Sequence, residues 1–454
     1  MWKFGRVVDL CVMGKKSYET HRMGVSMDGQ ISRVRQLFES VKDKRAQNTV
    51  YSLPDILMSG FAMFSLKYAS LLDFEQQTSL EAENLSSVYG IEQMCSDVQM
   101  RRVLDTHDPD FIRKEYSRRF KDLQKTGLLA EYEYKVGSQK YLIASCDGVQ
   151  HFSSKSLSCS CCLRKEHRDG TCTYHHSMLC AALVHPQKRE VFLLNCEPIV
   201  QQDGIDKNDC ERNAAKRLQK NMKTDYAAYA GRYRFLFVED ALYANTPHIE
   251  ELLANGHSYI LNAKPDSHKT LFAQVEGRRH RKQLNTWACS QNGVTHRFEW
   301  ANNLVLCNTR PHIRVNFLCC QQTDKTGKTT TFTWITDIPI NQDRVWAIMK
   351  AGRSRWKIEN ETFNTLKNLG YNFEHNYGHG DDHLSTMFAY LMMLAFYVDQ
   401  FVQACSKVFQ QLQANIKTKV KIWSTIRALF QTTRCPSMNF IYAQVAALFL
   451  IKLE

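Results

Sequence analysis

Apolar residues recur at helical spacing near the start of the chain and at strand spacing in its middle. Between residues 51 and 135, positions such as Ile56, Phe61 and Phe64 predict helices. From residue 136 onward, short apolar runs bounded by Asp and Gly predict strands. Helical spacing returns from about residue 338 to the C-terminus. The pattern therefore predicts a mixed α/β chain with helices on either side of a strand-rich middle.

The strand-rich middle has a definite order of elements. Three strands, a helix, a strand, a helix and a strand are predicted at residues 141–146, 178–184, 191–194, 207–222, 234–239, 248–254 and 258–261. This is the order of a ribonuclease H-like α/β fold, and we place its first part at residues 136–264. Residues 265–337 then read as a β-rich insertion, with a basic turn at residues 278–282, and residues 338–454 as the closing helices.

The N-terminal part divides into two segments. Residues 1–50 are polar and basic with weak periodicity, so we expect them to be partly disordered. Residues 51–135 predict a helical domain that contacts DNA through basic clusters such as Arg101-Arg102 and Arg118-Arg119. Packing of these helices against the strand-rich middle of the chain would explain their apolar residues equally well.

Charge points to a polyanionic partner. The 454 residues include 59 Lys and Arg against 46 Asp and Glu, a formal net charge of +13. Several basic clusters could contact phosphates, including the one from Arg353 to Lys357. The apolar run at residues 384–398 is too short to cross a bilayer, and the N-terminus has no secretory pattern. We expect a cytoplasmic, nucleoid-associated protein without membrane contact, whose 16 Cys are mostly reduced thiols.

Two aspartates follow predicted apolar strands. Asp147 comes after residues 141–146 and Asp240 after residues 234–239. In open α/β sheets, sites form at the carboxyl ends of strands. Two carboxylates brought together there repel one another unless a divalent cation binds between them. The alternative is that each is an ordinary residue at a strand end.

A third carboxylate lies on a predicted helix at residues 352–368. At about 100° per residue, Trp356 and Phe363 form an aromatic stripe that is expected to pack on the sheet. Glu359 then lies at the edge of the buried face, whereas Glu361 points elsewhere. Two Asp from strands and one Glu from a late helix are typical of a two-metal phosphoryl-transfer site.

These motifs resemble bacterial insertion-sequence DDE transposases. The matching residues are Asp147-Gly148, Asp240-Ala241-Leu242-Tyr243-Ala244 and Arg355-Trp356-Lys357-Ile358-Glu359. The resemblance implies Mg²⁺-dependent cleavage and strand transfer of double-stranded DNA at element ends and target. It implies that Asp147, Asp240 and Glu359 bind two Mg²⁺ ions, for which Mn²⁺ could substitute. It also implies a homodimer or larger assembly on DNA, with Arg355 and Lys367 holding phosphate, and we add the neighbouring cations Arg353 and Lys357.

Three positions depart from the family pattern. Gly352 stands where a Tyr is usual, and Ala241 where a Gly is usual. Lys367 follows Glu359 by eight residues and not seven, which places it about 80° from the stripe of the Glu on an α-helix. Two other functions therefore stay open: a plain metal-dependent nuclease, and a relative that binds DNA without catalysis.

A Cys and His cluster predicts a second metal site. Cys159-x-x-Cys162 is followed by His167, Cys172, His175 and His176. The two Cys with two of these four residues would close a zinc tetrahedron, and we take Cys159, Cys162, His167 and His175 as the candidate set. A chance grouping in a Cys-rich chain is the alternative. His375, His379 and His383 have helical spacing, but Gly378 and Gly380 argue against a helix there and therefore against a metal site.

Overall fold

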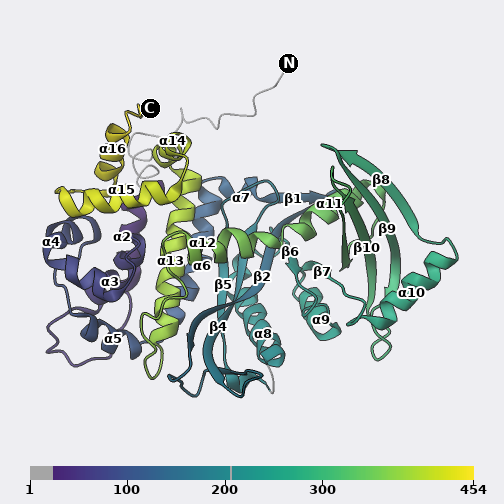
Figure 1. Cartoon of the computed structure of the whole chain (residues 1–454), viewed down its shortest axis with the longest axis horizontal. Coiled ribbons are helices and arrows are strands. Elements are labelled where there is room, and N and C mark those ends of the chain that lie inside the picture. The colour runs from purple at the N-terminus through teal and green to yellow at the C-terminus, as the bar shows by residue number, and fades with distance from the viewer. Residues whose placement is uncertain (1–23, 205–206, 454) are drawn as a thin grey trace. The chain divides into compact units, whose positions relative to one another are not determined.

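A computed structural model describes residues 24–204 and 207–453 of the chain. The predicted disorder of the N-terminus falls largely on residues 1–23, which lie outside the described residues. The chain divides into two compact units (Figure 1). One comprises Met1–Leu104 and Leu394–Glu454, and the other comprises Asp105–Met393.

The first unit is helical. It contains α2 (Met27–Glu39), α3 (Leu53–Ser65), α4 (Leu71–Tyr89), most of α5 (Asp97–Asp105), α14 (Lys407–Ile416), α15 (Lys419–Thr432) and α16 (Met438–Leu448). Serine side chains cap α2, α3 and α4, because each accepts a hydrogen bond from a backbone N–H in the first turn. Lys67 forms a buried ion pair with Asp399 at 2.6 Å.

The second unit is built on one mixed sheet. Its strands are β1 (Glu133–Val136), β2 (Gln139–Ser154), β3 (Leu163–Glu166), β4 (Cys172–Val184), β5 (Phe192–Ile199), β6 (Phe235–Glu239), β7 (Ser258–Asn262), β8 (Asn285–Gln291), β9 (Val294–Val305), β10 (Arg314–Thr323) and β11 (Thr329–Thr336). β4 lies between β2 and β5 and is antiparallel to both. On the other side of β2, β6 is parallel to β2 and β7 is parallel to β6. These five strands therefore lie side by side in the order β5-β4-β2-β6-β7.

The apolar runs of the sequence form the buried strands of this sheet. All five residues of β6 are buried, and in β4 so are the ten residues from His175 to Val184. The remaining helices in this part of the unit are α6 (Asp110–Lys125), α7 (Leu128–Glu131), α8 (Lys207–Asp225) and α9 (Thr246–Ala254). The helical segment expected at residues 51–135 thus contains α3 to α7, and α6 and α7 belong to the unit that carries the sheet.

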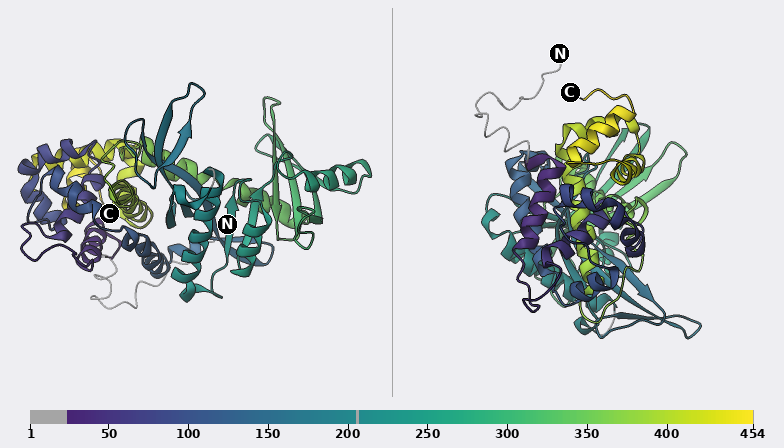
Figure 2. Two further views of the ribbon diagram at one scale, coloured as in Figure 1. Left: turned by 90° about the horizontal axis from the view of Figure 1, so that it is seen from below. Right: turned by 90° about the vertical axis from the view of Figure 1, so that its left-hand side faces the viewer.

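The residues expected to form an insertion extend the same sheet. β11 pairs antiparallel with β7, and β10, β9 and β8 follow in order. Figure 2 shows the β10–β11 hairpin projecting from this part of the unit. Of the basic residues at 278–282, expected in a turn, the first three end the helix α10 (Lys269–His280), where Arg279 forms ion pairs with Glu276 and Glu299. Arg281 and Lys282 form a turn after it, as predicted.

The apolar segment that begins at residue 384 forms the helix α13 (Leu384–Cys405), which is longer than the predicted run of 15 residues. It is the one helix in the described part of the chain that is long and apolar enough to cross a membrane. Most of its apolar window, 89%, is buried inside the protein, as is also common for a core helix. Its first turn is capped by Asp105, whose carboxylate accepts hydrogen bonds from the backbone N–H groups of residues 381–384.

The predicted helix at residues 352–368 is a composite of several segments. α11 (Gln342–Arg353) ends in a turn at Ser354, and the π-helical segment η4 (Ile358–Phe363) and α12 (Asn364–Asn368) follow. Phe363 is buried as expected. The prediction that Trp356 packs on the sheet is wrong, because 55% of this residue is exposed.

Close packing against the sheet explains why residue 352 is a glycine. A Cβ atom added to it would lie 2.7 Å from Nε1 of Trp334 on β11 and 3.1 Å from Cγ2 of Ile260 on β7. Helix α11 therefore contacts the sheet through the bare backbone of Gly352. A tyrosine, which the resemblance leads one to expect here, would not fit in this structure.

We predict that Gly352→Ala destabilises the protein by about 1–2 kcal/mol. Overpacking against the indole of Trp334 costs about 1–3 kcal/mol, and the higher helix propensity of Ala returns up to about 1 kcal/mol. Gly277→Ala in α10 is the matched control, since its Cβ would lie 3.7 Å from the nearest side-chain atom, in ordinary contact. Chemical denaturation should show a loss for Gly352→Ala and none for Gly277→Ala. Equal stability of the two variants would contradict the close approach.

Candidate active site

Asp147 lies inside a central strand. The sequence places it after a short strand, but β2 continues to Ser154, and Asp147 pairs with Cys180 of β4. On the other side, Ser145 of β2 is opposite Val238 of β6 in a parallel pairing. Asp240 lies two residues beyond Val238, as Asp147 lies two residues beyond Ser145. Asp240 is the residue that follows β6, so it lies just past the end of the strand adjacent to the one that carries Asp147.

Glu359 approaches Asp147 from the helical segment. Arg355 Nη1 lies 3.1 Å from Oδ2 of Asp147 and 2.6 Å from Oε1 of Glu359. The side chains of Asp147 and Glu359 are also hydrogen-bonded to each other. The hydroxyl of Ser145 donates to the carbonyl of Arg355 at 3.0 Å, which fastens this turn to β2. Two of the three predicted carboxylates thus meet around one guanidinium group.

The electrostatics of this pair are unfavourable for two negative charges. Burial raises the pKa of Asp147 to about 7, a hydrogen bond that the protonated Asp147 donates to Glu359 acts in the same direction, and Arg355 opposes them. The carboxyl group of Asp147 therefore keeps its proton up to about pH 7 in the absence of a second cation. A divalent ion with oxygen ligands would stabilise both carboxylates in their ionised form.

Asp240 occupies a separate position. Its Oδ1 accepts a hydrogen bond from the backbone N–H of Leu242 at 2.8 Å. It lines a pocket of about 460 Å³ together with Arg212, Lys264 and His268. Among the described residues, the group of three or more side chains placed to hold a metal ion is Cys159, Cys162, His176 and His379, and the three carboxylates do not form one. The structure therefore joins Asp147 to Glu359, while Asp240, one residue after β6, lies outside their group.

The π-helical segment explains the late position of Lys367. The backbone N–H of Asn364 donates to the carbonyl of Glu359, five residues earlier, which is the π-helical bond. Such a turn accommodates one extra residue, so eight residues after Glu359 bring the chain back to within about 20° of its side. Lys367 lies in this restored position and forms an ion pair with Glu374 at 2.6 Å. Its predicted contact with DNA phosphate stays a prediction.

The two other predicted phosphate contacts are held within the protein. Arg353 donates a hydrogen bond to the side chain of Gln322 and lies over the ring of Phe332, 4.7 Å from its centroid. Lys357 donates to the carbonyl of Lys188, and burial lowers the pKa of Lys357. Contacts with DNA by these two residues would require their side chains to leave these partners.

A fourth carboxylate was missed in the sequence. Glu211 of α8 approaches Gly148, where an added Cβ would lie 3.4 Å from its carboxyl group. It accepts a hydrogen bond from the hydroxyl of Tyr243 at 2.8 Å. Gly148 and Tyr243 both belong to the motifs that carry the resemblance. Gly148, the small residue after Asp147, was therefore the signal in the sequence that another side chain approaches this position.

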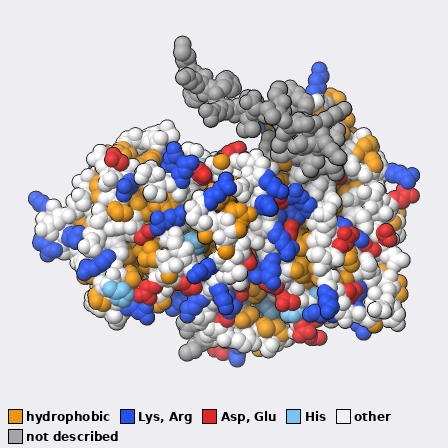
Figure 3. Space-filling model, turned by 180° about the vertical axis from the view of Figure 1, so that it is seen from behind, with side chains coloured by type: hydrophobic (Ala, Val, Ile, Leu, Met, Phe, Trp, Pro, Cys, Tyr) orange, Lys and Arg blue, Asp and Glu red, His pale blue; other side chains and the backbone are white. Residues whose placement is uncertain are grey.

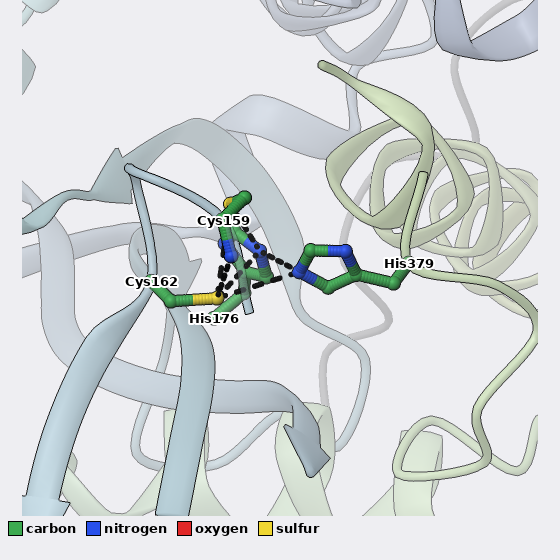
Figure 4. A group of neighbouring side chains, drawn as sticks. All are labelled: Cys159, Cys162, His176 and His379. Carbon is green, nitrogen blue, oxygen red and sulfur yellow. Dashed lines mark hydrogen bonds between the residues drawn. The ribbon is translucent and has the colours of Figure 1, made fainter. Parts of the chain in front are cut away.

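The Cys and His residues also converge, in a different combination from the candidate set. Cys159 and Cys162 meet His176 and His379 (Figure 4). His167 instead contacts the hydroxyl of Thr173 at 2.9 Å, and His175, next to His176 on β4, points to the opposite face of the strand. The glycines beside His379 exclude a helix, as expected, but they do not exclude a ligand from a loop.

We predict that the Asp147 carboxyl group makes stability depend on pH in the metal-free protein. Its folded pKa of about 7 lies above the ordinary 3.8, so the folded state holds the proton more tightly. The stabilisation is complete below about pH 4 and is lost as pH rises through 7, by up to about 4 kcal/mol. Asp147→Asn removes this dependence, whereas Asp266→Asn, at an exposed position, retains it. Denaturation curves at pH 4 to 8 test this, and a pH-independent difference between wild type and Asp147→Asn would contradict it.

Comparison with known proteins gives little beyond this geometry. No family model matches the chain, and no curated protein matches it. Among solved structures, it is similar to a piggyBac transposase synaptic complex with hairpin DNA, with a TM-score of 0.39 and 11% sequence identity. That similarity covers 95% of this chain and 80% of the other. A similarity at this level carries no argument about function, and the function proposed below rests on the residues of this chain.

Proposed function

We propose that the protein is a DNA transposase of the DDE type, which cleaves DNA strands and transfers them to a target. The observation that carries the proposal is the meeting of Asp147 with Glu359 around Arg355, next to the end of the strand that leads to Asp240. The strand order β5-β4-β2-β6-β7, with β4 antiparallel to its neighbours, supports a ribonuclease H-like catalytic unit. The carboxylates then come from one central strand, from the residue that follows the adjacent strand, and from one late helical segment.

The donor set fits hard divalent cations. Three carboxylates provide oxygen ligands, and a cation bound beside Asp147 would offset the burial and the nearby Glu359 that raise its pKa. Asp147, Asp240 and Glu359 would hold Mg²⁺ or Mn²⁺. Bound there, two ions would activate a hydroxyl nucleophile and stabilise the leaving 3′ oxygen.

The protein's own residues position the reacting groups. Asp147 is fixed by its strand, and Ser145 ties the Arg355 turn to that strand, so the distance between Asp147 and Glu359 is held by backbone contacts. Arg355 pairs with both carboxylates in the protein alone. When cations take over that role, the guanidinium group is placed to bind a phosphate of the DNA.

Double-stranded DNA is the proposed partner. The pocket beside Asp240 is lined by Arg212 and Lys264, whose charges suit a phosphate backbone. Figure 3 shows Lys and Arg side chains spread over one whole face of the protein, in keeping with the net charge of +13. A homodimer or larger assembly on two DNA ends would supply one site for each end.

We predict that Glu359→Gln lowers Mg²⁺-dependent cleavage at least about 100-fold, because it removes a metal ligand. Glu361→Gln is the matched control: it is the same chemical change two residues away, at a side chain whose electrostatic neighbour is Lys357. Nicking of supercoiled plasmid in Mg²⁺ measures both. Similar losses in the two variants, or full activity of Glu359→Gln, would contradict the assignment.

A second experiment separates transposase, nuclease and DNA-binding protein. Pre-cleaved duplexes with free 3′-OH ends, taken from DNA that flanks the gene, are incubated with plasmid and Mg²⁺. We expect joined products from wild type and none from Asp240→Asn, with DNA binding retained in the variant. Cleavage without joining would favour a plain nuclease. Binding with neither reaction would favour a protein that has lost catalysis.

A further inference from the structure

Four potential metal ligands come together from three distant parts of the chain. Cys159 and Cys162 lie in the connection between β2 and β3, His176 lies on β4, and His379 lies in the loop between α12 and α13. In Figure 4 both sulfur atoms and the two imidazole rings point toward a common centre. Their four ligand atoms all lie within 4.8 Å of one another.

Five of the six distances between the ligand atoms match those of a zinc tetrahedron, and the sixth, between Cys159 and His379, is at most 4.8 Å. Bonds of about 2.3 Å to sulfur and about 2.05 Å to nitrogen require separations of about 3.75 Å for S–S, about 3.55 Å for S–N and about 3.35 Å for N–N. The two Sγ atoms are 3.7 Å apart, and the two Nε2 atoms 3.2 Å. The three S–N distances are 3.5 Å for Cys159–His176, 3.4 Å for Cys162–His176 and 3.4 Å for Cys162–His379.

Other interactions do not account for this geometry. A disulfide would need the two sulfur atoms about 2.05 Å apart, and they lie at nearly twice that distance. Hydrogen bonds alone would be poorly matched, because each thiol and each neutral imidazole has only one proton to donate, while Nε2 of His176 contacts three of these atoms at once. A cation at the centre would accept one lone pair from each of the four ligand atoms.

The surroundings hold His379 in the orientation that a ligand needs. Its Nδ1 lies 2.6 Å from the carbonyl of Gly380, so Nδ1–H donates there and the lone pair is left on Nε2. The backbone N–H of Cys159 donates to Sγ of Cys162 at 3.4 Å, a contact that favours a thiolate.

We propose that Cys159, Cys162, His176 and His379 bind a structural Zn²⁺ ion. Four protein ligands leave no position for substrate, so the ion stabilises the fold and does not react. It joins the loop that follows the Glu359 segment to β4, the strand that pairs with Asp147 through Cys180. Asp105 fixes the other end of the same loop at the start of α13. The ion thus restrains the segment between the helix of Glu359 and α13.

The test is the metal content of the full-length protein, which does not depend on any DNA reaction. We expect about one zinc per chain by mass spectrometry of the dialysed wild type, and at least about tenfold less in His379→Ala and Cys162→Ser. Cys161→Ser and His375→Ala are the matched controls, since these neighbours lie outside the group and should retain the zinc. Wild type reconstituted with Co²⁺ should show the absorption of tetrahedral Co²⁺ with thiolate ligands.

Hydrogen exchange provides a second measurement in case a variant folds poorly. Removal of zinc from wild type with a chelator should speed exchange of the loop at residues 369–383 more than that of the strands β6 and β7. His379→Cys, which keeps a ligand, should restore zinc binding lost in His379→Ala. Zinc-free wild type, or His379→Ala with full zinc and an unchanged Co²⁺ spectrum, would overturn the proposal. Neither result would bear on the carboxylates, so failure here is distinct from failure of the transposase proposal.

Discussion

Arg355 lies between two carboxylates, Asp147 on a central strand and Glu359 on a π-helical turn, and the surrounding structure determines how these three groups meet. The strand is fixed by β4 on one side and β6 on the other. The turn is fixed to the strand by Ser145. Burial and the neighbouring Glu359 raise the pKa of Asp147, and a divalent cation bound beside these groups would favour their ionised forms.

Two unusual backbone features of the helical segment bring Glu359 close to Asp147. Gly352 allows α11 to approach Trp334 and Ile260 more closely than any side chain would permit. The π-turn that begins near Glu359 then absorbs one residue, so that the following turn keeps its orientation. These two features explain why Glu359 still lies next to Asp147, although the sequence departs from the insertion-sequence pattern at Gly352 and at Lys367.

The strands of the unit that carries the sheet could be predicted because they are buried on both faces, so runs such as residues 235–238 are continuously apolar. Glu359 could be chosen over Glu361 from helical spacing, since only about two turns separate it from Gly352. The π-turn could not be predicted, because no side-chain pattern marks a hydrogen bond between residues five apart. Nor could His379 be paired with His176, which lies 203 residues away on another element. The exposure of Trp356 was missed because the turn at Ser354 shifts the helical face.

The central claim is that Asp147, Asp240 and Glu359 together bind divalent cations. Crystals of the full-length protein soaked in Mn²⁺, with data collected at the manganese absorption edge, test it most directly. The account predicts anomalous peaks bound by all three carboxylates, with Arg355 displaced from its position between Asp147 and Glu359. Manganese found elsewhere, or bound without Asp240 or without Glu359, would contradict it.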